Sequence, residues 1–325
     1  MPNLAASVRV LGLVLVAVVL LPSIIVAQVS VPRTPEGKPD LSGVWNFSTA
    51  TPMQRPEELA GKETLTREEA AEYEQRLAER RRAGDSTSET ASLEARVSYE
   101  QAIWFERGDT LAAYRTSLVV RPTKGRIPAM RPEALARGVA RRVMRQRPAY
   151  GPEDRGISER CLMGFNSGPP MTPSAYNNNV QLFLTPRYFA MLNEMVHNTR
   201  LVPIDGRPHL SAGLRQWAGD SRASWDGDTL VVETRNFLRE TSLGGSSANL
   251  HLVERFTRVD PDTLHYEFTV TDPTTWVGPW TALVYMTRND DPIYEYACHE
   301  GNYSMPSSLL GARAVEAAAA ADDPQ

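Results

Sequence analysis

The sequence predicts a mainly β protein: an antiparallel meander that closes on itself as a barrel, with a helical insertion after the first strand. From residue 180 onward, runs of alternating apolar and polar residues are separated by turn signals such as Asp226-Gly227. In the run "TLHYEFTVT" the apolar residues share one face, which is typical of an antiparallel sheet with one buried side. Closure removes exposed edge strands and is preferred here to the alternative, an open sheet covered by helices.

Residues 1–27 have the features of a secretory signal peptide. Arg9 precedes an apolar run that Pro22 interrupts and that ends at the small residue Ala27. The alternative is an N-terminal membrane anchor, because the run is nearly long enough to span a bilayer. Pro22 favours cleavage, so the mature chain is expected to begin near Gln28. It would work in the periplasm or outside the cell, without a stable membrane anchor.

The two cysteines, Cys161 and Cys298, are expected to form a disulfide, because an even pair in an exported chain is most simply a cross-link. It would contribute at most about 5 kcal/mol in the chain-entropy description. The alternative, a nucleophilic Cys298, needs an exposed thiolate kept reduced outside the cell. The neighbours His299 and Glu300 would point to opposite faces of a strand and could not easily hold one ion together.

The remaining elements follow in order along the chain. "LSGVWNF" is expected to be the first strand, with Trp45 packed. Thr66 and Glu69 have capping-box spacing, so a helix is expected to begin there and to end at Gly84, before a second helix over 89–105. The expected divisions are 1–27 signal peptide, 28–55 extended stretch and first strand, 56–150 mostly helical insertion, 151–179 Gly/Pro-rich loop, 180–312 β barrel and 313–325 disordered tail.

A basic helix is expected in "RPEALARGVARRVMRQRP". Its arginines could form a patch for an anionic surface. The more common arrangement is pairing with acidic neighbours, for which Glu68, Glu69 and Glu72 are candidates. The chain's net charge of −4 gives no overall case for a nucleic-acid partner. The cluster consists of Arg137, Arg141, Arg142, Arg145 and Arg147.

Four residues of the strand-rich half are candidate catalytic residues: Glu194, His197, His209 and His251. If they converge with Arg255 at a barrel mouth, imidazole and carboxylate groups could act as acid and base or bind zinc. The alternative for each histidine is a hydrogen-bonded structural role. The spacing matches no standard motif, so neither a metal site nor a cofactor is expected.

Aromatic residues along the strands offer a second kind of site. Trp217, Trp225 and Tyr285, with Arg255 as a polar anchor, are the candidate ligand-binding residues of an apolar pocket. The alternative is that these rings belong to the barrel core.

The stretch from Gly43 to Trp45, followed by hairpins with Asp-Gly turns, resembles the lipocalin and calycin barrels. The stretches "IDGRPHL", "QWAGDSRASWDGDTLVVETRNF" and "IYEYACHEGNY" resemble a large group of secreted bacterial proteins with no assigned activity, over about two thirds of the chain. The resemblance implies export and a calycin-like barrel, and it supplies no catalytic residue. The long helical insertion after Trp45 departs from ordinary lipocalins.

These observations predict an exported barrel that binds a small, largely apolar molecule and fixes the polar end of that molecule. One alternative is an extracytoplasmic hydrolase or lyase that uses the histidine and glutamate candidates. Another is a structural subunit of a periplasmic complex. The oligomeric state is not predicted.

Overall fold

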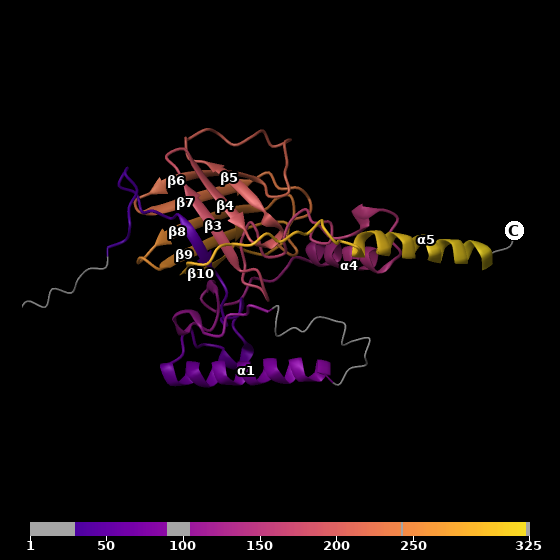
Figure 1. Ribbon diagram of the computed structural model, residues 1–325, viewed down its shortest axis with the longest axis horizontal. Coiled ribbons are helices and arrows are strands. Elements are labelled where there is room, and N and C mark those ends of the chain that lie inside the picture. Colours follow the sequence, from indigo (N-terminus) through magenta and orange to yellow (C-terminus); the bar gives the residue numbers. More distant parts are fainter. Residues whose placement is uncertain (1–29, 90–104, 242, 323–325) are drawn as a thin grey trace, which may run out of the picture.

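The computed structural model describes residues 30–89, 105–241 and 243–322 (Figure 1). The predicted signal peptide lies outside the described residues, and so does nearly all of the second helix expected over 89–105. No helix in the described part of the chain is long and apolar enough to cross a membrane.

One ten-stranded antiparallel sheet forms the body of the protein, in the order β5-β4-β3-β1-β10-β9-β8-β7-β6, with β2 paired to β10. The predicted hairpin at Asp226-Gly227 is present, and Gly227 takes the positive φ of 59° that such a tight turn requires. The strands are β1 (Gly43–Asn46), β2 (Val119–Arg121), β3 (Asn179–Leu184), β4 (Tyr188–Asn193), β5 (Thr199–Pro203), β6 (Asp220–Asp226), β7 (Thr229–Arg235), β8 (His251–Arg258), β9 (Thr263–Thr271) and β10 (Trp280–Asn289).

The sheet is not closed into a barrel, so this part of the prediction is not confirmed. Its two ends, β5 and β6, are not joined by a ladder in the described structure. The segment 204–219 between them contains Gly206 and Pro208 and forms an irregular connection instead of a hairpin. The sheet is nevertheless strongly curved. Phe189 of β4 packs edge-on against Phe256 of β8 with ring centroids 5.1 Å apart, although these strands are far apart in the strand order.

Side chains fill the inside of the curved sheet. Alternate residues of β8 and β9 are buried, as the period-two pattern predicts. Trp45 is fully buried in this core and donates its indole N–H to the Leu41 carbonyl at 3.0 Å. The other large, fully buried members of this core include Trp280, Tyr266, Phe237, Phe256 and Phe268.

A charged network lies within this apolar interior. Arg200 of β5 makes a bidentate ion pair with Glu254 of β8, at 2.6 and 2.8 Å, and Glu254 is fully buried. The Tyr266 hydroxyl donates to the same carboxylate at 2.7 Å and accepts from the Met171 amide at 3.1 Å. Burial and the Glu254 carboxylate raise the pKa of Tyr266 well above its usual value. Because β5 and β8 are far apart in the strand order, the network links the two ends of the curved sheet.

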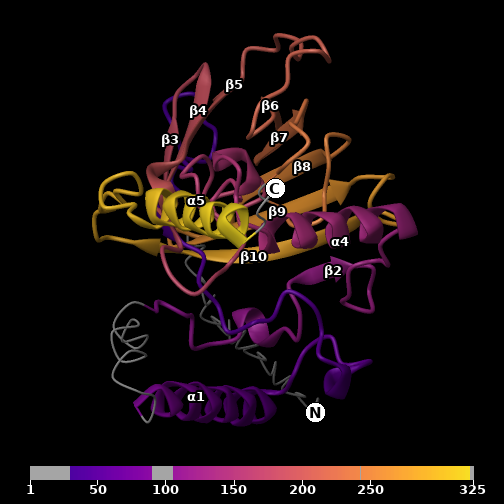
Figure 2. The same cartoon turned by 90° about the vertical axis from the view of Figure 1, so that its right-hand side faces the viewer.

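The helices lie outside the sheet (Figures 1 and 2). The predicted capping box starts α1: Thr66 Oγ1 accepts from the Glu69 amide at 3.2 Å, and Glu69 Oε2 accepts from the Thr66 amide at 3.1 Å. This helix continues through Gly84, so the predicted end at that residue is wrong. The helices are α1 (Arg67–Glu89), α4 (Pro132–Gln146) and α5 (Ser304–Asp322), with short 3-10 turns η1 (Glu57–Leu59), η2 (Ala112–Tyr114), η3 (Pro152–Asp154) and η4 (Met195–His197).

The C-terminal region differs from the prediction in two ways. The strand expected in "PIYEYAC" is an irregular segment, and Tyr294 within it is exposed. The tail expected to be disordered over 313–325 is helical as far as Asp322, consistent with the high helix propensity of its alanine run. The predicted disulfide is confirmed: Cys161 and Cys298 are bonded, with Cα atoms 5.7 Å apart.

Candidate functional site

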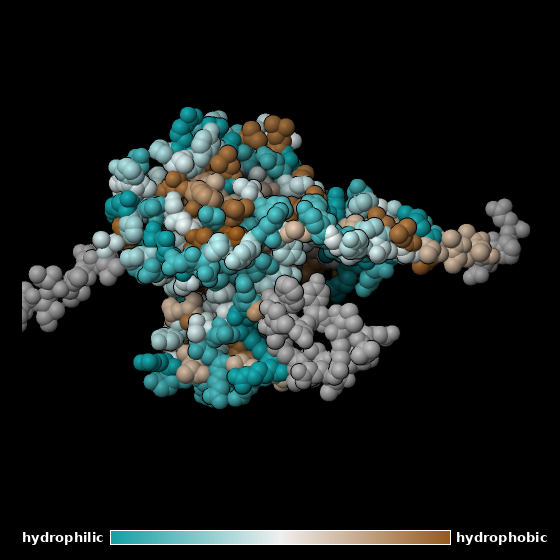
Figure 3. Space-filling view, in the orientation of Figure 1, coloured by the Kyte–Doolittle hydropathy of each residue, from teal (hydrophilic) through white to brown (hydrophobic). Residues whose placement is uncertain are grey.

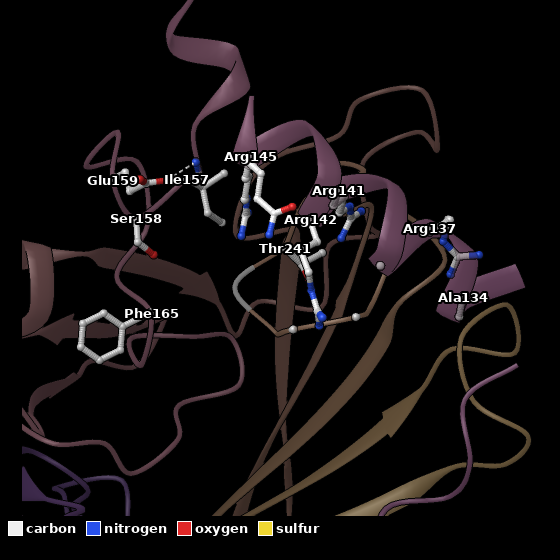
Figure 4. Close-up of a pocket in the computed structure, with 15 residues that line it drawn as sticks. Ala134, Arg137, Arg141, Arg142, Arg145, Ile157, Ser158, Glu159, Phe165 and Thr241 are labelled. Carbon is white, nitrogen blue, oxygen red and sulfur yellow. Dashed lines mark hydrogen bonds between the residues drawn. The ribbon is translucent and has the colours of Figure 1, made fainter. Parts of the chain in front are cut away.

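A cavity of about 690 Å³ lies between α4 and two loops (Figure 4). Arginine side chains extend from α4 on one side, and Ser158, Glu159 and Phe165 stand on the other. The loop between β7 and β8 contributes Thr241 and Gly245. The arginines that line the cavity are Arg137, Arg141, Arg142 and Arg145.

Two of these arginines hold α4 against the end of the sheet. Arg137 donates to the Thr274 carbonyl at 3.1 Å and to Thr275 Oγ1 at 3.2 Å. Arg141 donates to the Arg239 carbonyl at 3.1 Å. These bonds use neutral acceptors, so they fix the helix without neutralising the guanidinium charges.

The other two arginines, Arg142 and Arg145, make no side-chain hydrogen bond or ion pair with the described part of the chain. Glu159 is the acidic residue of the cavity wall, and its carboxylate accepts the Gly156 amide at 2.6 Å. Among the described residues, no carboxylate lies within ion-pair distance of any of the four cavity arginines. Burial and three neighbouring arginines lower the pKa of Arg141 below its usual value, against the opposing effect of Glu240. The cavity therefore carries a net positive charge, with four arginines and one glutamate in its lining.

The expected pairing of these arginines with the acidic residues of the earlier helix is wrong. Glu69 pairs with Lys62, and Glu72 pairs with Arg76 within its own helix. In Figure 2, α1 lies on the far side of β10 and β2 from α4. The space-filling view shows that α1 presents a largely hydrophilic surface of its own (Figure 3).

The structure brings two of the four candidate catalytic residues together. His251 Nε2 lies 2.7 Å from Glu233 Oε1, and His209 Nε2 lies 3.7 Å from Glu233 Oε2. His209 Nδ1 in turn contacts Asp220 Oδ2 at 2.9 Å. The His209 Nε2 atom is buried and faces the Glu233 carboxylate rather than an open cavity. These contacts hold His209, and with it the segment 204–219, against Asp220 of β6 and Glu233 of β7.

Glu194 and His197 lie elsewhere, at the end of β4. Glu194 Oε2 accepts from Asn179 Nδ2 at 2.9 Å, and His197 Nδ1 lies 3.1 Å from the Tyr296 carbonyl. The four candidates therefore do not form one site. Within the described residues, no three histidine, cysteine, aspartate or glutamate side chains gather in a way that could hold a metal ion.

The candidate ligand-binding residues are also dispersed over the surface. Arg255 pairs with Asp226 at 2.9 Å. Trp225 stacks under the Lys38 ammonium at 5.4 Å, and Tyr285 meets His265 edge-on at 4.6 Å. Trp217 lies under Arg160, whose guanidinium carbon is 5.8 Å from the ring centroid. These contacts pair each side chain locally rather than around one ligand.

Replacing Asp220 with asparagine is expected to lower the free energy of unfolding at neutral pH by about 1–3 kcal/mol. Burial raises the pKa of Asp220, but hydrogen bonds from the Leu210 amide, His209 and Arg222 outweigh it and leave the pKa below its usual value. Such a carboxylate stabilises the fold fully above the unfolded-state pKa of about 3.9, and this stability is lost as the pH falls through the folded-state pKa. Urea titrations from neutral pH to about pH 3 should show a smaller acid loss for Asp220→Asn. Equal losses in both proteins would contradict this role.

The arginine cluster was visible in the sequence, but the cavity was not. Its other walls come from Ile157 and Phe165, which follow α4 after an irregular stretch, and from the β7–β8 loop, which lies far from α4 in the chain. No local spacing connects these segments. A scan against protein-family models finds no matching family, and a search of curated proteins finds no match.

Proposed function

We propose that this protein is an exported binding protein for a small organic anion, held in the arginine-lined cavity. The observation that carries the proposal is the pair of guanidinium groups of Arg142 and Arg145, which have no partner among the described residues and line a hollow of about 690 Å³. Guanidinium groups bind phosphate and carboxylate through paired, charge-assisted hydrogen bonds. Ile157 and Phe165 line the same hollow and would contact an apolar part of the ligand. This arrangement fits a phosphate or carboxylate on a small apolar body.

The site differs in place from the barrel interior that the sequence suggested. Core side chains and the Arg200–Glu254 pair occupy the space inside the curved sheet. The proposed cavity lies outside the sheet, at the end where α4 and the β7–β8 loop meet. As in the sequence-based prediction, the proposed ligand has a polar end and an apolar part. The difference is that the polar end, bound by arginines, now supplies most of the binding.

Export and kinship with the calycin barrels belong to the same proposal. The disulfide supports an oxidising compartment such as the periplasm or the cell exterior. The leader-like sequence over 1–27 points the same way. The buried Trp45 on the first strand and the long antiparallel meander support a calycin-like origin, with the barrel opened between β5 and β6.

Isothermal titration calorimetry with phenyl phosphate tests the site. The double variant Arg142→Gln/Arg145→Gln is expected to bind at least ~10-fold more weakly, because a hydrogen bond to a charged group contributes about 1.5–3 kcal/mol. Inorganic phosphate is expected to bind less tightly than phenyl phosphate, because it cannot contact Phe165.

A matched control removes the same charge elsewhere. Arg80 and Arg82 are exposed arginines of α1, outside the cavity, with no ion pair to a described residue. Arg80→Gln/Arg82→Gln should leave the affinity unchanged. Equal weakening in both double variants would show non-specific attraction, and the absence of binding by the unaltered protein would refute the proposal.

A further inference from the structure

The outward face of α4 is apolar and exposed. Leu135, Val139 and Val143 recur at intervals of four residues and therefore lie along one side of the helix. Their exposed fractions are 54%, 61% and 61%. Ala136 and Ala140 extend the same face and are also exposed. The helix has 15 residues, so this face is about 22 Å long.

This orientation is the reverse of an ordinary surface helix, which turns its apolar stripe toward the core. In α4, Ala134 is buried, and the half-buried Arg137 and Arg141 face the body of the protein. The arginine side therefore anchors the helix, and the aliphatic side is left in water. Leaving several large aliphatic side chains exposed along one helix face is unfavourable unless something covers them.

The positive charge of the arginines around this apolar face indicates a negatively charged partner. Residues 131–147 contain six arginines and one glutamate, although the whole chain has a net charge of −4. Arg142, which also lines the cavity, is exposed on the helix, and Arg131 stands exposed at its N-terminal end. Arg147, at the other end, pairs with Asp154 at 3.0 Å. A second copy of the same face would oppose arginine with arginine. An anionic phospholipid bilayer offers both an apolar layer and negative charge to a basic amphipathic helix.

We propose that α4 lies in the surface of an anionic bilayer, with Leu135, Val139 and Val143 inserted below the headgroups. The exposed arginines would contact lipid phosphates at the level of the helix axis. Figures 1 and 2 show α4 at the periphery of the protein, on the same side of the sheet as α5. This inference goes beyond the proposed ligand cavity and does not depend on it, because none of the three aliphatic residues lines that cavity.

Co-sedimentation of the mature chain with vesicles tests the inference. Vesicles of equal parts phosphatidylglycerol and phosphatidylcholine are expected to bind the protein, and pure phosphatidylcholine vesicles are expected to bind it more weakly. Val139→Asn/Val143→Asn should lower the partition coefficient at least ~10-fold, because two buried aliphatic side chains are lost from the interface. Far-UV circular dichroism verifies that the variant is folded.

The control is a pair of equally exposed apolar residues elsewhere. Leu201 and Leu214 are 62% and 57% exposed and lie outside α4. Leu201→Asn/Leu214→Asn should bind the anionic vesicles like the unaltered protein.

Four results would overturn the inference. One is no binding to anionic vesicles, and another is equal loss in the two double variants. The third is a dimer, detected by light scattering, that Val139→Asn/Val143→Asn dissociates, since the face would then join two copies. Saturating phenyl phosphate should not release the vesicles, and release would show that lipid occupies the cavity instead.

Discussion

Glu254→Gln is expected to lower the free energy of unfolding by about 3–5 kcal/mol, because it leaves the buried Arg200 guanidinium without its counter-charge. The glutamine side chain also offers Arg200 and Tyr266 one acceptor oxygen where the carboxylate offers two. Urea denaturation followed by tryptophan fluorescence measures the change. The loss of stability should appear as a large drop in the urea concentration at the midpoint of unfolding.

Two further variants separate the buried charge from a general effect of mutation. Glu267→Gln changes a glutamate on the outer side of β9 and should alter stability by no more than about 0.5 kcal/mol. Arg200→Met/Glu254→Leu replaces both charges with apolar groups and should recover much of the lost stability. If Glu254→Gln were as mild as Glu267→Gln, the network could not be joining the two ends of the sheet.

Cys161→Ser/Cys298→Ser is the second change with a large expected effect. The cross-link spans 137 residues of sequence, and the chain-entropy part of its loss is expected to cost at most about 5 kcal/mol. Local packing adds to this, because Cys161 is buried beside Met195 and Val196. Thermal unfolding with and without reductant measures the difference.

The reductant also provides the control for the cysteine variant. It should lower the melting temperature of the unaltered protein and leave that of the double serine variant unchanged. A melting temperature that is the same in the unaltered and serine proteins would mean that the bond does not stabilise the native chain.

Features fixed by neighbouring residues could be predicted from the sequence. The turn at Asp226-Gly227 and the capping box of Thr66 and Glu69 depend on a few adjacent residues, and both are present. The alternation in β9 also matches its buried side. The cysteine pairing followed from the number of cysteines and the expected compartment.

Features set by distant contacts were missed. Residues 293–297 alternate like a strand, but β10, which they follow, pairs with β9 on one side and with β2 and β1 towards the two ends of its other side. Closure of the sheet depended on the course of residues 204–219, which carry no period-two pattern. The pairing of the arginines depended on the distance between α1 and α4, which no spacing within either helix reveals.

The pairing of β1 with β3 brings together two strands that are far apart in the sequence. Asn46 and Asn179 face each other across the β1–β3 ladder, so the chain leaves the sheet after one and re-enters it beside the other. Most of the chain in between, including α4 and the first cysteine, leaves the sheet at this point and rejoins it briefly at β2, which pairs with β10. Insertions or deletions in the parts of this stretch that lie outside the sheet could therefore change the residues around the cavity without shifting the register of β1 and β3.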